Sequence, residues 1–109
     1  MSVRCTKPWR AVDAATVTAL PGQLGVFELA DAAERVVYIG RADARSLFGL
    51  RGEITRCLAD FPEARSFRYE VTTAYHTRYL ELLMVHAYDF GALPRFNPPL
   101  PTLGRLTPG

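Results

Sequence analysis

Residues 25–40, with the sequence Gly-Val-Phe-Glu-Leu-Ala-Asp-Ala-Ala-Glu-Arg-Val-Val-Tyr-Ile-Gly, contain two short runs rich in residues that favour β-strands. The first run is Gly25 to Ala30 and the second is Arg35 to Gly40. The four residues between them, Asp31 to Glu34, make a connection of hairpin length. This stretch therefore predicts an antiparallel β-hairpin, and the other elements are placed relative to it.

The segments after the hairpin predict a helix, a third strand and a second helix. From Asp43 to Phe61, apolar residues recur at three- and four-residue spacing, and Asp43 is placed to cap the helix. Ser66 to Thr73 alternates between apolar and polar residues, which is typical of a half-buried strand. His76 to Phe90 is apolar nearly all round and is followed by Gly91, which favours a largely buried helix with a glycine end.

The two ends of the chain differ in character from its centre. Residues 1–23 predict a lead-in with a short helix after Asp13 that Pro21-Gly22 stops. Residues 24–97 form the central domain, and residues 98–109 are a proline-rich C-terminal tail. The predicted fold class is α+β: a small three-stranded antiparallel sheet flanked by helices.

Composition sets limits on function. A chain of 109 residues with 49% hydrophobic and 22% charged residues is expected to fold as one globular domain. Thirteen basic and eleven acidic residues give a formal charge of +2, too small to indicate nucleic-acid binding by itself. Cys5 and Cys57 stand alone, and no signal peptide or long apolar run is present, which favours a reduced, cytoplasmic protein without membrane association. A homodimer that enlarges the small core stays open.

Two tripeptides of the hairpin, Gly25-Val26-Phe27 and Tyr38-Ile39-Gly40, resemble the paired motif of the GIY-YIG nucleases. Ten residues separate Phe27 from Tyr38. In that family the hairpin is followed by a helix with a catalytic Arg, a third strand, a helix with a metal-binding Glu, and an Asn shortly after a Pro. Arg51, Glu81 and the segment Pro94-Arg95-Phe96-Asn97 occupy the corresponding places in this chain. The resemblance covers residues 24 to 97 and implies a GIY-YIG-like fold.

The resemblance also implies hydrolysis of nucleic acid that depends on Mg²⁺ or Mn²⁺. Glu81 would hold the ion, and a single carboxylate suffices because Mg²⁺ keeps most of its waters. Arg51 would steady the charge on the phosphate, and Tyr38 would position the attacking water. Arg41, directly after the motif glycine, is a candidate phosphate contact, and Arg45 and Asn97 complete the set of candidate nucleic-acid-binding residues.

Several of these residues have a second interpretation. Helical periodicity places Arg51 on the inward side of its helix, yet Arg45 is a rival because the family Arg usually follows the glycine more closely. Glu81 can instead form an ion pair with Arg78, three residues earlier. Asn97 can bridge backbone groups instead of ordering water near a metal.

Phe27 departs from the motif, because the family has a Tyr there whose hydroxyl helps to activate water. Phenylalanine cannot accept or relay a proton, and the family's further His or Tyr is replaced by Thr55 or a neighbour. Assistance by a general base is commonly worth about 10² to 10⁴ in rate, so weak or lost cleavage is expected. The alternative function is a non-catalytic module on the same fold that binds nucleic acid or a protein. A small structural homodimer is the third interpretation.

Overall fold

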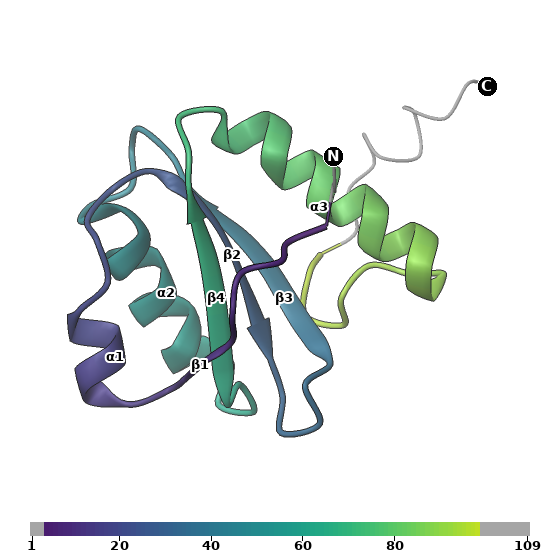
Figure 1. Cartoon of the computed structure of the whole chain (residues 1–109), viewed down its shortest axis with the longest axis horizontal. Helices are drawn as coiled ribbons and strands as arrows, with labels where there is room; N and C mark the ends of the chain where they lie inside the picture. The colour runs from purple at the N-terminus through teal and green to yellow at the C-terminus, as the bar shows by residue number, and fades with distance from the viewer. Residues whose placement is uncertain (1–3, 99–109) are drawn as a thin grey trace.

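Four strands and three helices follow one another in residues 4–98, the part of the chain that the computed structural model describes (Figure 1). In chain order they are β1 (Arg10–Ala11), α1 (Ala14–Thr18), β2 (Gly25–Ala30), β3 (Val36–Ala42), α2 (Gly49–Asp60), β4 (Ser66–Val71) and α3 (Tyr75–Phe90). The strands form one antiparallel sheet in the order β1-β4-β2-β3. The fold is therefore α+β, as the sequence predicts, but its sheet has four strands instead of three.

The central strand β2 is buried along its whole length because helices cover both faces of the sheet (Figure 1). Phe27 and Leu29 point to the face that packs against α2, whereas Val26 points to the face that packs against α3. Alternate residues of a strand point to opposite faces, so a central strand in such a three-layer arrangement is apolar on both sides. The run that predicts a strand is thus the middle of the core.

The fourth strand, β1, lies in the lead-in, where the sequence predicts only a short helix. Arg10 is paired with Phe67 and Ala11 with Ser66 of β4, so β1 extends the sheet beyond β4. Two residues are too few to show an alternating pattern, which explains why the strand was not predicted. The predicted short helix is confirmed as α1, and Asp13 caps it by accepting a hydrogen bond from the Thr16 backbone N–H.

The helix predicted from Asp43 to Phe61 is shorter than expected, because α2 begins only at Gly49. Asp43 caps a turn instead of a helix: its carboxylate accepts a hydrogen bond from the Arg45 backbone N–H at 2.9 Å. Phe48 and Gly49 then adopt left-handed φ angles of 62° and 55°, which interrupt any helix from the turn into α2.

The helix α3 covers the predicted range and ends at Phe90, with Gly91 as its C-cap, but it is less buried than its composition suggests. Its buried side chains are Tyr79, Leu82 and Leu83, whereas Tyr88 is 85% exposed. One face of α3 packs on the sheet and the other meets solvent. No helix within residues 4–98 combines the length and the apolar character needed to cross a membrane.

The segment that follows α3 lies along β3, the outer strand of the sheet. The Phe96 backbone N–H donates a hydrogen bond to the Val37 carbonyl at 3.0 Å, and the Asn97 side chain contacts Ile39. These contacts cover part of an otherwise unpaired strand edge. The predicted tail, residues 98–109, lies outside the described residues except for Pro98.

Candidate functional site

A polar pocket of about 360 Å³ lies at the β3 edge of the sheet, where β3, α2 and α3 meet. We call it the edge pocket. It is lined by the end of β3 and the turn after it, by two residues of α2 and by one of α3: Tyr38, Gly40, Arg41, Asp43, Arg45, Ser46, Glu53, Arg56 and Tyr79. Three of the predicted site residues, Tyr38, Arg41 and Arg45, therefore lie in one pocket.

Arg41 is held in place by an aromatic ring. Its guanidinium carbon lies 4.7 Å from the centre of the Tyr79 ring, a cation–π distance. Stacking on the face of the ring leaves the N–H edge of a planar guanidinium able to bind a phosphate in bidentate fashion. Because β3 is an edge strand and Tyr79 lies on α3, this contact also joins the strand to the helix.

The acidic residues of the edge pocket already have partners. Glu53 forms an ion pair with Arg56 at 2.8 Å, and Asp43 accepts hydrogen bonds from the turn that carries Arg45. Those hydrogen bonds hold the pKa of Asp43 below its usual value. Within residues 4–98, neither Arg41 nor Arg45 forms an ion pair. With Arg56 paired to Glu53, the pocket keeps two arginines without an ion pair and one carboxylate, Asp43, whose charge acts on both of them. The net charge of the lining is therefore +1.

Tyr38 contributes a neutral hydroxyl to the edge pocket. Burial, followed by the neighbouring Cys57 thiol, raises the pKa of Tyr38 to about 12. A phenol with this pKa stays protonated at neutral pH, so it can donate a hydrogen bond but cannot act as a general base. Its ring packs between Phe27 and Phe61, with ring centres 6.1 Å and 4.8 Å away.

Arg51 does not lie in the edge pocket, and the prediction that it faces inward is wrong. The side chain is exposed, and its guanidinium lies near Gly22 of the lead-in. The helical count that turned Arg51 inward included Leu47, which lies before the start of α2 and is 79% exposed. With the helix beginning at Gly49, the buried positions of its first turns are Gly49, Leu50 and Ile54.

Glu81 also lies outside the edge pocket and has a cationic partner. Its carboxylate accepts a hydrogen bond from Arg78 at 2.7 Å, and Arg78 also binds both carboxylate oxygens of Glu70 on β4. The ion pair between Glu81 and Arg78, the second interpretation from the sequence, is thus present in the structure. The prediction that Glu81 holds Mg²⁺ stays a prediction, and in this structure its carboxylate is bound to Arg78. Within residues 4–98, no group of three or more His, Cys, Asp or Glu residues is arranged to hold a metal ion.

Asn97 is buried and bonded on both sides to the backbone of one residue. Its carbonyl oxygen accepts a hydrogen bond from the Ile39 N–H at 2.8 Å, and its amide nitrogen donates to the Ile39 carbonyl at 2.9 Å. A side-chain amide thus takes the place of a neighbouring strand. The structure therefore shows Asn97 bridging backbone groups, and both of its polar atoms are used in doing so.

Replacing Asn97 by Asp is expected to destabilise the protein by about 3 kcal/mol at pH 7, because a buried carboxylate oxygen would face the Ile39 carbonyl. Burial and this repulsion would raise the pKa of the introduced carboxyl above its unfolded value. Its protonated form restores the donor, so the deficit should be smallest below the unfolded pKa and grow as the pH rises through the folded one. Urea unfolding of wild type and Asn97→Asp at pH 4 and pH 7 measures this; an equal deficit at both pH values would contradict it.

The two motif glycines allow close approach, as the sequence suggests. A Cβ atom on Gly25 would lie 2.1 Å from the Glu70 carbonyl oxygen, and one on Gly40 would lie 2.3 Å from the Phe27 ring. Phe27, which stands in the place of the family Tyr, is 1% exposed and fills the space that Gly40 leaves. Its role in this fold is to pack the core.

Residues 1–89 match a protein family described as "Domain of unknown function (DUF7508)". The chain belongs to this family. The match includes the lead-in, which the structure shows paired with the sheet through β1. No curated protein matches the chain, and neither comparison connects it with the GIY-YIG nucleases.

Sequence reasoning missed two side chains that matter most to the edge pocket, Tyr79 on α3 and Arg56 on α2. Arg56 lies five residues after Arg51 on α2, so it projects from a different side of that helix. Nothing in the spacing of Arg41 and Tyr79 along the chain signals their contact, because it depends on how α3 crosses the sheet.

Proposed function

We propose that this domain binds nucleic acid through the edge pocket and that it does so without catalysing hydrolysis. The observation that supports this best is that Arg41 and Arg45 line the same pocket. Arg41 is stacked on Tyr79, and Arg45 lies on the turn that Asp43 caps. Neither guanidinium group forms an ion pair with a described residue, and Asp43 is the one carboxylate of the pocket whose charge acts on both.

The chemistry of the pocket suits the phosphate backbone. Two arginines offer planar sets of N–H donors that match phosphate oxygens. Contacts of this type position a nucleic acid and carry no direct sequence information. We therefore expect weak sequence preference and an affinity that depends strongly on salt.

The GIY-YIG resemblance is part of this proposal, as a fold whose catalytic residues have changed. Supporting features are the packed Phe27 in place of the motif Tyr, the Arg78 guanidinium bound to Glu81 and the exposed Arg51. Hydrolysis would need a base, an arginine and a metal ligand together at Tyr38. Arg45, the rival for the arginine, lies in the pocket with Tyr38, but Arg51 and Glu81 do not line it and Phe27 supplies no base. Binding is therefore better supported than cleavage.

The test is a fluorescence anisotropy titration of labelled single-stranded DNA, double-stranded DNA and RNA with the full chain at increasing KCl. We expect binding at low salt. A plot of the logarithm of the association constant against the logarithm of the KCl concentration should fall with a slope of about 2, for two phosphate contacts. The absence of binding to all three at the lowest salt would refute the proposal.

A cleavage assay separates binding from hydrolysis. Supercoiled plasmid is incubated with wild type and with Glu81→Gln in Mg²⁺ or in Mn²⁺. We expect intact plasmid from both proteins. Nicking by wild type that Glu81→Gln abolishes would establish the metal-dependent nuclease instead, and equal nicking by both would indicate a contaminating enzyme.

A further inference from the structure

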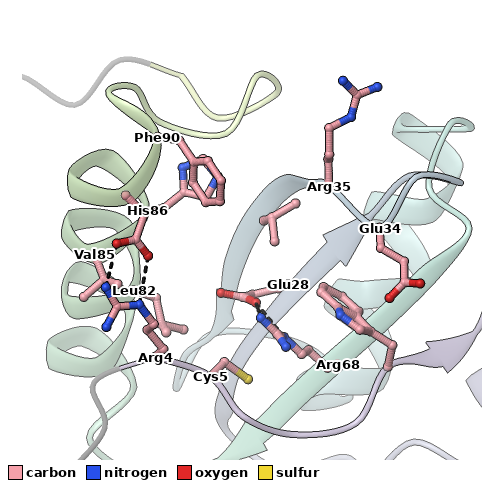
Figure 2. Close-up of a pocket in the computed structure, with 13 residues that line it drawn as sticks. Arg4, Cys5, Glu28, Glu34, Arg35, Arg68, Leu82, Val85, His86 and Phe90 are labelled. Atoms are coloured by element: carbon pink, nitrogen blue, oxygen red, sulfur yellow. Dashed lines mark hydrogen bonds and ion pairs between the residues drawn. The ribbon is translucent and has the colours of Figure 1, made fainter.

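A second pocket, of about 540 Å³, lies on the opposite side of the α3–sheet contact from the turn at Asp43. We call it the α3 pocket. Its walls come from the segment before β1, from β2 and the β3 end of the hairpin, from β4 and from the second half of α3 (Figure 2). Its volume falls within the range of sites that hold small organic molecules.

A buried carboxylate faces this pocket. Glu28 lies in the middle of β2 and is only 5% exposed, which makes it an unusual charged residue in an otherwise apolar strand. Its Oε1 atom accepts a hydrogen bond from Nε of Arg68 at 2.7 Å and lies 2.7 Å from Nη2 of the same guanidinium in an ion pair. Figure 2 shows the other carboxylate oxygen turned away from Arg68 toward the open part of the pocket. No described residue is hydrogen-bonded to that second oxygen.

Three of the thirteen side chains that line the α3 pocket are aromatic. The Trp9 ring stacks on the guanidinium of Arg68, 4.1 Å from its central carbon to the ring centre. The rings of His86 and Phe90 on α3 lie 4.6 Å apart and form another part of the wall (Figure 2). Leu82 adds an aliphatic surface. Flat, apolar ligands are favoured by walls of this type, since aromatic rings stack on them.

The charges that line the α3 pocket balance. Three arginines, Arg4, Arg35 and Arg68, are matched by three acids, Glu28, Glu34 and Asp89. Arg4 is bound to Asp89 at 2.6 Å and Arg68 to Glu28, so the inner charges are paired within the protein. A charged ligand would have no unbalanced group to meet, which favours a neutral one.

We propose that the α3 pocket binds a neutral, planar nitrogen heterocycle that donates an N–H hydrogen bond to the second oxygen of Glu28. Nucleobases with an exocyclic amino group belong to this chemical class. The Glu28 carboxylate accepts the hydrogen bond that orients the ligand, and the aromatic side chains supply contact area. The ion pair between Glu28 and Arg68 holds the carboxylate in position. This site shares no lining residue with the edge pocket and does not depend on the proposed function.

The binding assay uses the fluorescence of Trp9, the only tryptophan of the chain, which lines the pocket. The probes are adenine and cytosine methylated at the nitrogen that carries the sugar in nucleosides, so that the amino group is their only N–H donor. Each is compared with its dimethylamino analogue, which has no donor. We expect at least one probe to change the emission saturably and its analogue to bind about tenfold more weakly or worse.

Two variants test the site itself. Glu28→Gln keeps the shape, but Arg68 would hold the amide oxygen and leave the NH₂ group toward the ligand, so affinity should fall about tenfold or more. Val85→Phe fills the pocket from α3 and leaves Glu28 and Arg68 in the sequence unchanged, and it should also abolish binding. Met84→Phe is the matched control, because Met84 is the next residue along α3, is exposed and does not line the pocket.

The outcomes are decisive even if Glu28→Gln does not fold, since the Val85→Phe and Met84→Phe pair is independent of the ion pair. Failure of both probes to bind wild type, equal affinity for the dimethylamino analogues, or unchanged binding by Val85→Phe would each overturn the proposal. An oligonucleotide titration of Val85→Phe then decides whether the bound heterocycle is a base of a nucleic acid or a free molecule. Weakened binding there would mean that the base of a nucleic acid enters the pocket, and unchanged binding would mean that a free molecule does.

Discussion

Replacement of both Arg41 and Arg45 by Glu is expected to weaken nucleic-acid binding about a hundredfold at low salt. The double substitution removes the two unpaired cations of the edge pocket and puts carboxylates in their place, next to the phosphates. The dependence of affinity on salt should also disappear, because no counterions would be released from these two contacts. Anisotropy titrations of the variant and of wild type over a range of KCl concentrations measure both effects.

The matched control is the double variant Arg10→Glu with Arg51→Glu, which changes the formal charge by the same amount, from +2 to −2. Arg10 and Arg51 are both exposed and neither lines the edge pocket. We expect this control to lose far less affinity, since charge at a distance is screened by salt. Equal losses in the two double variants would mean that only net charge matters and that the edge pocket has no special role.

The largest expected effect on stability comes from Gly25→Ala. A Cβ atom at this position would lie 2.1 Å from the carbonyl oxygen of Glu70, so β2 and β4 would have to separate where β2 begins and β4 ends. Overpacking against backbone that cannot rotate away is expected to cost about 3 kcal/mol or more. Urea unfolding followed by circular dichroism measures the loss.

Gly22→Ala provides the comparison for this substitution. A Cβ atom on Gly22 would have its nearest neighbour, the Phe48 carbonyl oxygen, at 3.5 Å, an ordinary contact distance. Its effect should stay within about 1 kcal/mol, because the only change is a small loss of freedom in the unfolded chain. A Gly25→Ala variant as stable as Gly22→Ala would show that β2 and β4 are not packed as closely as the structure indicates.

Much of the fold can be predicted from local pattern, and the hairpin is the clearest case. The strands β2 and β3, the strand β4 and the helix α3 are confirmed within a few residues of their predicted bounds. Each has a regular pattern with a turn residue or glycine at its end. The strand β1 and the late start of α2 could not be predicted, because they depend on contacts with distant parts of the chain.

The start of α2 shows how such a contact acts. The Leu50 N–H donates to the Gln23 carbonyl at 2.9 Å, and the Arg51 N–H donates to the Pro21 carbonyl at 3.2 Å. The lead-in thus satisfies backbone donors of the first turn that a capping side chain would otherwise bind. Asp43 is a residue type that commonly caps helices, but here it belongs to a separate turn. Because the predicted helix began too early, the periodicity placed Arg51 on the wrong side of it.

The site residues could be predicted only where they follow the motif directly. Tyr38, Arg41 and Arg45 lie on β3 or on the turn after it, so their proximity follows from the chain itself. Arg51 and Glu81 lie on helices whose rotation about their own axes depends on packing. For the α3 pocket, the sequence does carry a signal: Glu28 is the only charged residue in the run Gly25 to Ala30, and a buried acid needs a partner.

The most direct test of nucleic-acid binding at the edge pocket is a map of amide chemical shifts in ¹⁵N-labelled protein during titration with a short oligonucleotide. We predict that the largest changes fall on Gly40 to Ser46 and on Tyr79, with little change around Arg51 and Glu81. Changes centred on Arg51 or Glu81, or no changes at an oligonucleotide concentration that saturates binding, would contradict the assignment of the binding site to the edge of β3.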